Sequence, residues 1–289
     1  MLILTMTIQK SGYNYNTTIS QCRYGLFAPI QKNTDRSRII AGKIKYGNIE
    51  ISFSKVLTQI HQDIILALLT FYEKKGIDDG TIITLYNPSS ILRKLNQKGK
   101  NTNWLLKKIQ EISDTDLNVK ILTKEKEIKI SGKIIIEKGS SKIKNQATSF
   151  KDVFLAYVKF GSIYSSFFNF DINMQIKNVE DVIGIKHGVV KAFVKYVLTT
   201  SSGKNFHFNI PLLKILYEIK AIDENTPTRT LRQLIKYISD QRDFLKEKFG
   251  IIINKDIVFY YPKNNNVYFK NIAESDKYSR LMELELVNQ

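Results

Sequence analysis

Residues 101–113 read NTNWLLKKIQEIS, and residues 227–239 read PTRTLRQLIKYIS. In both stretches the apolar residues lie three or four positions apart, which is the spacing of one buried face of an α-helix. A constant offset of 126 residues relates the two stretches, because it takes Leu105, Ile109, Ile112 and Ser113 to Leu231, Ile235, Ile238 and Ser239. Chance similarity between two amphipathic helices is the alternative. We favour an internal repeat, which predicts one structural unit present twice.

The elements expected around the first stretch follow the order helix, strand, helix, helix, hairpin. A strand with alternating apolar residues, 43–53, precedes them. The expected ranges are a helix over 57–72, a strand over 81–86, a helix from 88, a helix capped by 101–103, and strands over 117–121 and 128–136. This order is typical of a winged helix, in which the hairpin after the third helix is called the wing.

The second half of the chain repeats this order. The expected ranges are a helix over 188–198, a strand over 205–208, a helix from 211, a helix from 226 that can extend to 248, and strands over 251–253 and 257–260. In the short helix from 211, we expect Leu212, Leu213 and Leu216 to face the core. A second offset, of 121 residues, takes Leu92, Arg93 and Leu95 to Leu213, Lys214 and Leu216.

The sequence therefore predicts an α+β fold with two tandem winged-helix domains related by a pseudo-repeat. The expected divisions are an N-terminal extension (1–42), a first winged-helix domain (43–172), a second winged-helix domain (173–270) and a C-terminal tail (271–289). Between the two repeats we expect extra strands over 149–160 and 163–170, followed by a connecting helix over 173–183.

Composition limits the class of protein. The chain has 289 residues, 43% of them hydrophobic, and a formal net charge of +17, so a globular protein that binds polyanions is the first expectation. A lysine-rich, well-solvated surface is the alternative. A single cysteine cannot form an intramolecular disulfide, and with three histidines it cannot supply a Cys/His zinc site, so a reducing cytoplasm fits. No apolar run reaches the roughly 18 residues of a membrane helix, so we expect no membrane partner and a cytoplasmic protein associated with the nucleoid or a plasmid.

Motifs for catalysis are missing from the sequence. No Gly-x-x-x-x-Gly-Lys phosphate loop precedes any Gly-Lys pair, and the histidines form no His-x-His pair that could bind the metal of a nicking site. Asp114 and Asp116 could hold Mg²⁺, as in a primase, but a two-metal site needs a further acidic ligand. Turn chemistry at a helix end is the interpretation that we favour. We therefore expect no cofactor and no enzymatic activity.

The residues expected to contact DNA lie on the two repeated helices and on the predicted wing. The side of each helix opposite its apolar stripe presents Asn, Lys, Gln and Arg, the side chains that read base edges in the major groove. Residues 120–144 contain eight Lys and three Glu, a net +5, as expected of a wing along the phosphate backbone. Solvated polar faces are the alternative. The candidates are Lys100, Asn101, Asn103, Lys107, Gln110, Lys124, Lys126, Lys142, Lys144, Thr228, Arg229, Arg232, Gln233 and Lys236.

Several of these stretches resemble the first winged helix of TrfA-like plasmid replication initiators. The resemblance is carried by 61–69 (HQDIILALL), 92–95 (LRKL), 99–105 (GKNTNWL) and 115–119 (TDLNV), and more loosely by 228–232 (TRTLR). It implies a protein that binds double-stranded DNA at directly repeated origin sites (iterons) and helps to open the duplex. It also implies recruitment of a host replication initiator and helicase. A homodimer is a separate expectation. A tandem winged-helix transcription regulator and, from another class, a primase-type enzyme are the alternatives.

Overall fold

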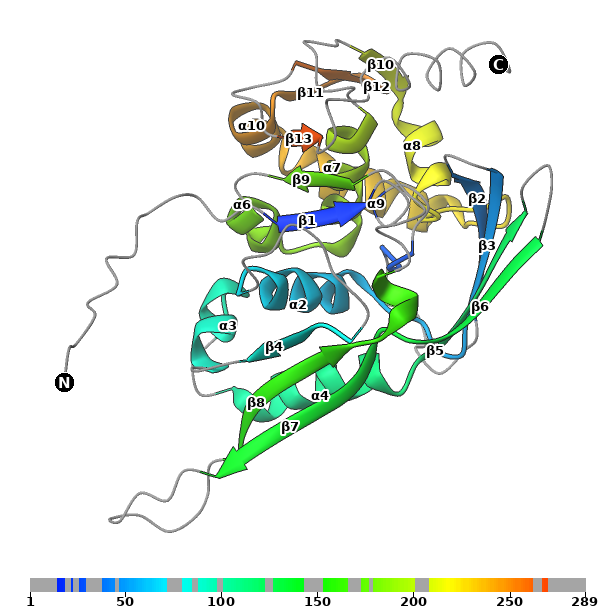
Figure 1. Ribbon diagram of the computed structural model, residues 1–289. Helices are drawn as coiled ribbons and strands as arrows, with labels where there is room; N and C mark the ends of the chain where they lie inside the picture. Colours follow the sequence, from blue (N-terminus) through cyan, green and yellow to red (C-terminus); the bar gives the residue numbers. More distant parts are fainter. Residues whose placement is uncertain are drawn as a thin grey trace.

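The computed structural model describes residues 15–18, 22, 26–29, 38–44, 47–71, 80–84, 88–97, 101–122, 127–142, 153–165, 173–176, 179–200, 208–261 and 267–269. Within these ranges the chain forms helices and four small sheets, and every strand pair in the sheets is antiparallel (Figure 1). The predicted α+β class is therefore confirmed. In the described part of the chain no helix is long and apolar enough to cross a membrane.

The first half contains the expected helices, and a strand lies in the expected range 81–86. The single strand expected over 43–53 is wrong, because this range is divided between β2 (Arg38–Ile44) and β3 (Gly47–Phe53), which pair with each other as an antiparallel hairpin. Helix α2 (Gln59–Leu69) is followed by strand β4 (Ile82–Thr84), helix α3 (Pro88–Lys94) and helix α4 (Thr102–Ser113). β4 belongs to a three-stranded sheet of order β4-β8-β7, in which β7 (Ile135–Lys142) and β8 (Val153–Phe160) are the other strands. β8 lies in the range 149–160, where the sequence predicted an extra strand.

The hairpin predicted as the wing belongs to another sheet. Its strands, β5 (Asp116–Leu122) and β6 (Glu127–Lys133), pair with each other as expected. Their partners, however, are β3 (Gly47–Phe53) and β2 (Arg38–Ile44), in a sheet of order β2-β3-β5-β6. The expected single strand over 128–136 is wrong, because β6 ends at Lys133 and β7 (Ile135–Lys142), which begins two residues later, belongs to a different sheet. Ile134 and Ile135 are both buried where the chain passes from one sheet into the next.

The second half repeats the arrangement with a shorter hairpin. Helix α7 (Gly188–Thr200), strand β10 (Phe208–Pro211), helix α8 (Leu212–Glu218) and helix α9 (Thr228–Ser239) occur in the predicted order. The last strands, β11 (Ile251–Asn254) and β12 (Ile257–Tyr260), complete a sheet of order β10-β12-β11. Helices α4 and α9 both have 12 residues, and their first and last residues obey the offset of 126.

One expectation for the second half is corrected, and another lies largely outside the described residues. Of the strand expected over 205–208, Phe208 is the first residue of β10, and residues 205–207 are outside the described part. The side chain of Leu213, expected in the core, is 42% exposed, whereas Ile215 is buried. α8 therefore turns the stripe Leu212, Ile215, Leu216 inward, and the offset of 121 fails at Leu213.

The third helix of the second half does not run unbroken to residue 248. α9 ends at Ser239, and a short helix α10 (Arg242–Phe244) and a π-helical turn η1 (Leu245–Phe249) follow. Gly250 ends this segment with a φ of 72°, a left-handed conformation that favours glycine. Because of this break, the exposed helix face that is expected to read bases is limited to the 12 residues of α9.

A fourth sheet connects distant parts of the sequence. Strand β9 (Asn173–Ile176) pairs with β1 (Tyr15–Thr18) on one side and with β13 (Val267–Phe269) on the other. The connecting helix expected over 173–183 is therefore wrong in its first part, and only α6 (Val179–Gly184) is helical. Where a strand was expected over 163–170, residues 162–165 are helical and the rest lie outside the described residues. The expected boundaries at residues 42, 172 and 270 stay predictions, and the β1–β9 pair crosses the first two.

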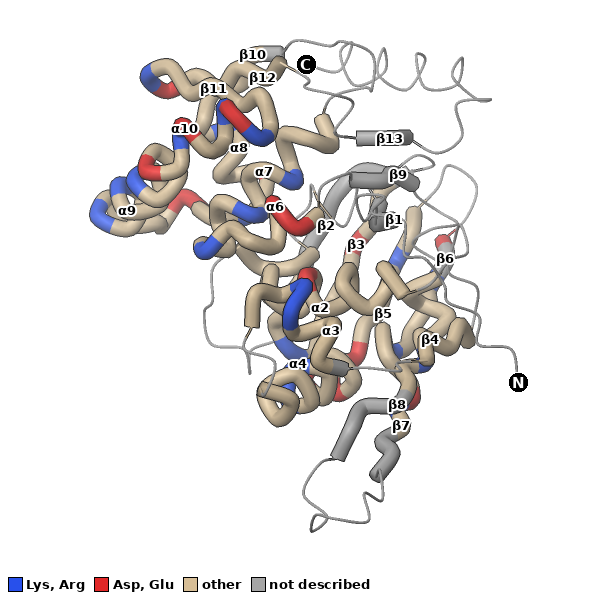
Figure 2. Tube along the Cα trace, turned by 90° about the vertical axis from the view of Figure 1, so that its left-hand side faces the viewer, with Lys and Arg blue, Asp and Glu red and all other residues tan. Residues whose placement is uncertain are grey.

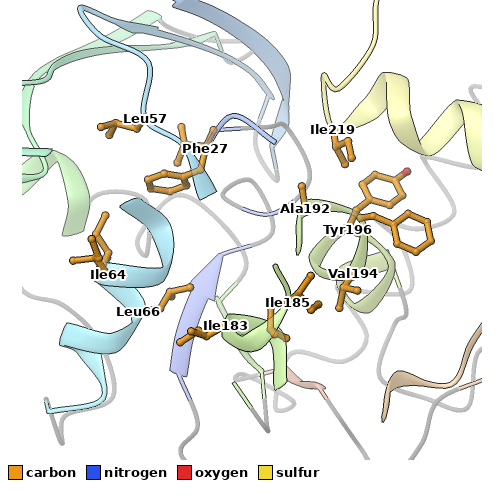
Figure 3. Close-up of a cluster of buried hydrophobic side chains, with 14 of the residues drawn as sticks. Phe27, Leu57, Ile64, Leu66, Ile183, Ile185, Ala192, Val194, Tyr196 and Ile219 are labelled. Atoms are coloured by element: carbon orange, nitrogen blue, oxygen red, sulfur yellow. The ribbon is translucent and has the colours of Figure 1, made fainter. Parts of the chain in front are cut away.

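Helices α2 and α7 form the centre of the molecule. α2 is buried from His61 to Leu69 and α7 from Val189 to Thr199. Figure 3 shows buried side chains of α2, including Ile64 and Leu66, in one cluster with side chains of α6 and α7. Because both helices are covered on all sides and their buried apolar side chains belong to one cluster, the two halves share a single core.

Candidate nucleic-acid interface

Helix α9 presents the strongest basic face of the described residues. Its exposed side chains include Arg229, Arg232, Gln233 and Lys236, and its sequence contains no Asp or Glu. Leu234 and Ile238 are buried on the opposite side, so packing fixes which side of the helix faces outward. In Figure 2 the Lys and Arg positions of α9 form the left edge of the upper half of the molecule. An acid-free, rigid helix of this kind suits a polyanion.

Three contacts hold side chains on or beside the exposed face of α9. The amide Nε2 of Gln233 donates a hydrogen bond of 2.6 Å to the hydroxyl oxygen of Tyr237. The ring of Tyr237 stacks on that of His187, with centroids 4.0 Å apart and an angle of 12° between the planes. Lys236 Nζ lies 2.7 Å from a carboxylate oxygen of Asp240, the residue that caps the helix. Gln233 is therefore held in one orientation before any ligand binds.

Helix α4 presents the matching face in the first half. Asn101, Asn103, Lys107 and Gln110 are exposed, whereas Leu105, Ile109 and Ile112 are buried in the expected stripe. Gln110 donates a hydrogen bond of 2.5 Å to Asp114, which caps α4 as Asp240 caps α9. The paired residues in the two helices, Gln110–Asp114 and Lys236–Asp240, are also related by the offset of 126.

One of the eight lysines in 120–144, which was not among the candidate contact residues, extends the α4 face. Lys138, in the middle of β7, contacts the side-chain oxygen of Gln110. β7 also packs against α4 through Ser113, whose hydroxyl donates a 3.2 Å hydrogen bond to the carbonyl oxygen of Ile135. The strand that adjoins α4 is therefore β7, and not a strand of the β5–β6 hairpin. The sequence did not indicate this contact, because the apolar residues in 128–136 predict one continuous strand and hide the start of β7.

His61 connects α4 to the core of the first half. Its Nδ1 accepts a 2.9 Å hydrogen bond from the backbone N–H of Thr58, so its Nε2 carries the proton and donates at 2.9 Å to Glu111 of α4. Burial lowers the pKa of His61, in keeping with this neutral form. His61 and Glu111 are related to His187 and Tyr237 by the same offset of 126. A histidine thus supports the third helix in each half.

The lysines expected on one wing are divided between two hairpins. On the β5–β6 pair, Lys120 and Lys129 lie 3.3 and 2.8 Å from the carboxylate of Glu127, so part of their charge is neutralised within the sheet. Hydrogen bonds from Lys129 and Lys120 lower the pKa of Glu127. Lys142 is the last residue of β7, and its side chain is outside the described part. The remaining wing and loop candidates, Lys100, Lys124, Lys126 and Lys144, lie outside the described residues.

The acidic pair considered for a metal site is occupied by protein groups. Asp114 accepts the hydrogen bond from Gln110, and Asp116 lies 3.6 Å from Lys133 on the neighbouring strand. Within the described ranges no three His, Cys, Asp or Glu side chains come together in a way that could hold a metal ion. The geometry of these two carboxylates is that of ordinary cap and ion-pair chemistry.

Comparisons with known proteins relate this chain to one solved fold. No protein-family description matches the sequence, and no curated protein matches it. The structure is similar to the crystal structure of domains 2 and 3 of RctB, with a TM-score of 0.56 and 13% sequence identity. The similarity covers 85% of this chain and 98% of the RctB chain. At this identity the match concerns the fold alone.

Proposed function

We propose that the protein is a sequence-specific double-stranded DNA-binding protein that acts in the initiation of DNA replication. The observation that carries the proposal is the exposed face of α9, with Arg229, Arg232, Gln233 and Lys236 and no acidic residue. Arginine pairs with guanine and glutamine with adenine through two hydrogen bonds in the major groove. RctB, whose domains 2 and 3 share this fold, is a replication initiator, which supports the replication role.

We interpret the two halves as winged helices. In each, the strand after the first helix pairs with the second strand of a hairpin, which gives the orders β4-β8-β7 and β10-β12-β11. The third helices α4 and α9 are then the recognition helices, and β7–β8 is the first wing. This assignment keeps Lys142 at the wing, because it ends β7, and adds Lys138 to the interface.

More specifically, we propose that the protein initiates replication of a plasmid by binding repeated sites at the plasmid origin. In this proposal the protein binds the repeats, promotes opening of the adjacent duplex, and brings in a host initiator and helicase, with a homodimer as one form. The protein itself makes and breaks no covalent bond and needs no cofactor. The absence of a Gly-x-x-x-x-Gly-Lys motif from the sequence supports a role in DNA binding, with the unwinding left to the recruited helicase.

Selection of duplexes from a randomised pool, followed by footprinting on the DNA that flanks the gene, tests DNA reading. Enrichment of one sequence and protection of direct repeats are the expected results. A plasmid that carries those repeats should then replicate only when the protein is supplied. Binding at a promoter without replication would favour a transcription regulator, and primer synthesis with nucleotides and Mg²⁺ would favour a primase.

A further inference from the structure

Three charged side chains are buried where α2 of the first half meets α7 of the second. Lys195 Nζ lies 3.2 Å from one carboxylate oxygen of Asp63, and Lys191 Nζ is paired with the other oxygen. Lys195 also donates hydrogen bonds of 2.9 and 2.8 Å to the side-chain oxygens of Gln59 and Gln62. These five residues, here called the junction network, join two elements that are about 130 residues apart.

The junction network is costly to bury and geometrically specific. Asp63 and Lys195 are 0% and 1% exposed, so all of their interactions with water are lost. Burial lowers the pKa of Lys195, and the negative charge of Asp63 opposes that shift. A buried ion pair often contributes no more stability than apolar residues of the same volume. Its clearest effect is on geometry, because all three ammonium donors of Lys195 have acceptors on α2 in only one register of the two helices.

Each helix of the junction supports one recognition helix. α2 contacts α4 through His61 and Glu111, with 2.9 Å between the nitrogen and the oxygen. The start of α7 is adjacent to His187, which stacks on Tyr237 of α9. The packing path from α4 to α9 therefore passes through α2, the junction network and α7.

The two recognition helices also face one side of the molecule. In Figure 2, α9 forms the left edge of the upper half, and α4 lies toward the left of the lower half. We take this side as the one that a DNA duplex approaches. Since successive major-groove faces are about 10 base pairs apart, the relative placement of α4 and α9 decides which spacing of two DNA segments is bound.

We propose that the junction network sets the spacing between the two DNA segments that this protein reads. The proposal rests on the proposed function, because it takes α4 and α9 as DNA-reading helices. The ligand is a DNA duplex that contains two segments at one fixed spacing, and the protein reads the bases of both segments. Gln59, Gln62, Asp63, Lys191 and Lys195 act as positioning residues that do not contact the DNA.

The test uses the full-length protein and the duplex enriched from the randomised pool. About 5 base pairs, half a helical turn, are inserted between the two protected segments, and the affinity is compared with that for the original duplex. For the natural protein we expect a loss of about 100-fold or more, because one recognition helix then loses base contacts worth about 1 to 3 kcal/mol each. In the triple variant Asp63→Leu/Lys191→Met/Lys195→Met the charges are replaced by apolar groups. We expect it to bind the original duplex and to lose about 10-fold or less on the insertion.

A matched control separates spacing from stability. Val258→Ala opens a cavity at a fully buried position in β12, away from the junction, and should lower thermal stability while keeping the spacing dependence of the natural protein. A folded triple variant with unchanged spacing dependence would overturn the proposal. The proposal can be overturned even if the triple variant fails to fold. Equal affinity of the natural protein for the original duplex and for the duplex with the insertion would do so. Failure to enrich any sequence is a different result, and it contradicts the proposed function itself.

Discussion

The imidazole of His187 stacks on the phenol ring of Tyr237 with 4.0 Å between the ring centroids. Because Tyr237 also accepts the hydrogen bond from Gln233, a residue outside α9 determines how a base-reading candidate is presented. His61 and Glu111 occupy the corresponding places in the first half. The same support of the third helix thus occurs in both halves with different chemistry.

Tyr237→Phe tests the orientation of Gln233. The substitution keeps a ring to stack on His187 and removes the oxygen that accepts the 2.6 Å hydrogen bond. We expect discrimination at one base pair of the selected duplex to fall by about 1 kcal/mol, the usual net value of such a hydrogen bond. Competition among duplexes that differ at single base pairs measures this. A uniform change at all base pairs would mean that Tyr237 does not orient a reader.

Leu212 and Leu213 are adjacent in α8 and should respond differently to truncation. Leu212 is 1% exposed and Leu213 is 42% exposed. Leu212→Ala should lower the free energy of unfolding by about 2 to 5 kcal/mol, and Leu213→Ala by roughly 0.5 kcal/mol or less. Urea unfolding of both variants measures the difference. Equal losses would contradict the orientation of α8.

Lys94 gives the protein a pH-dependent stability. Burial lowers its pKa to about 8, and its Nζ lies 5.0 Å from the centroid of the Phe71 ring. The pKa of an unfolded lysine is about 10.4, so the folded state disfavours the charged form. Below pH 8 this cost is fully present, and it is relieved as the pH rises to about 10.4. Lys94 should therefore make stability increase over that window.

The difference in melting temperature between the natural protein and Lys94→Met isolates this effect from other titrations. The melting temperature of the natural protein should rise relative to that of the variant as the pH increases from about 8 to 10. A parallel pH dependence of the two proteins would show that Lys94 has an ordinary pKa.

Asp114→Asn and Asp116→Asn test the absence of metal chemistry. We expect DNA affinity to stay the same or to increase slightly, because each substitution removes a negative charge near a surface that faces phosphate. The natural protein and both variants should neither synthesise primers with nucleotides and Mg²⁺ nor hydrolyse ATP. Magnesium-dependent primer synthesis by the natural protein, lost in these variants, would restore the primase alternative.

The repeated helices could be predicted from the sequence because their burial follows the helical period. Leu105, Ile109 and Ile112 are all buried, and the limits of α4 and α9 obey the predicted offset. Local spacing determined these features, so no tertiary information was needed. The exposed faces of α4 and α9 follow directly from the same stripes.

Features that depend on long-range pairing could not be predicted in the same way. The β5–β6 hairpin is locally correct, but its partner strand β3 comes from more than 60 residues earlier in the chain. The junction network was missed because Asp63 and Lys195 look like solvent-exposed charges on amphipathic helices. Only the packing of α2 against α7 buries them. A charged residue in an otherwise apolar helix of this kind is the available signal.

The central claim, that α9 reads base sequence, is tested by titrating Arg229→Ala and Arg232→Ala against the selected duplex and a scrambled duplex at several salt concentrations. Each variant should lose about 1 to 3 kcal/mol on the selected duplex and much less on the scrambled one. The exposed Lys55→Ala, outside the proposed interface, is the control and should bind both duplexes as the natural protein does. Equal losses on both duplexes, with a salt slope lowered by ~0.9 for each contact removed, would mean that α9 only holds the phosphate backbone. That result would contradict sequence-specific DNA binding through α9.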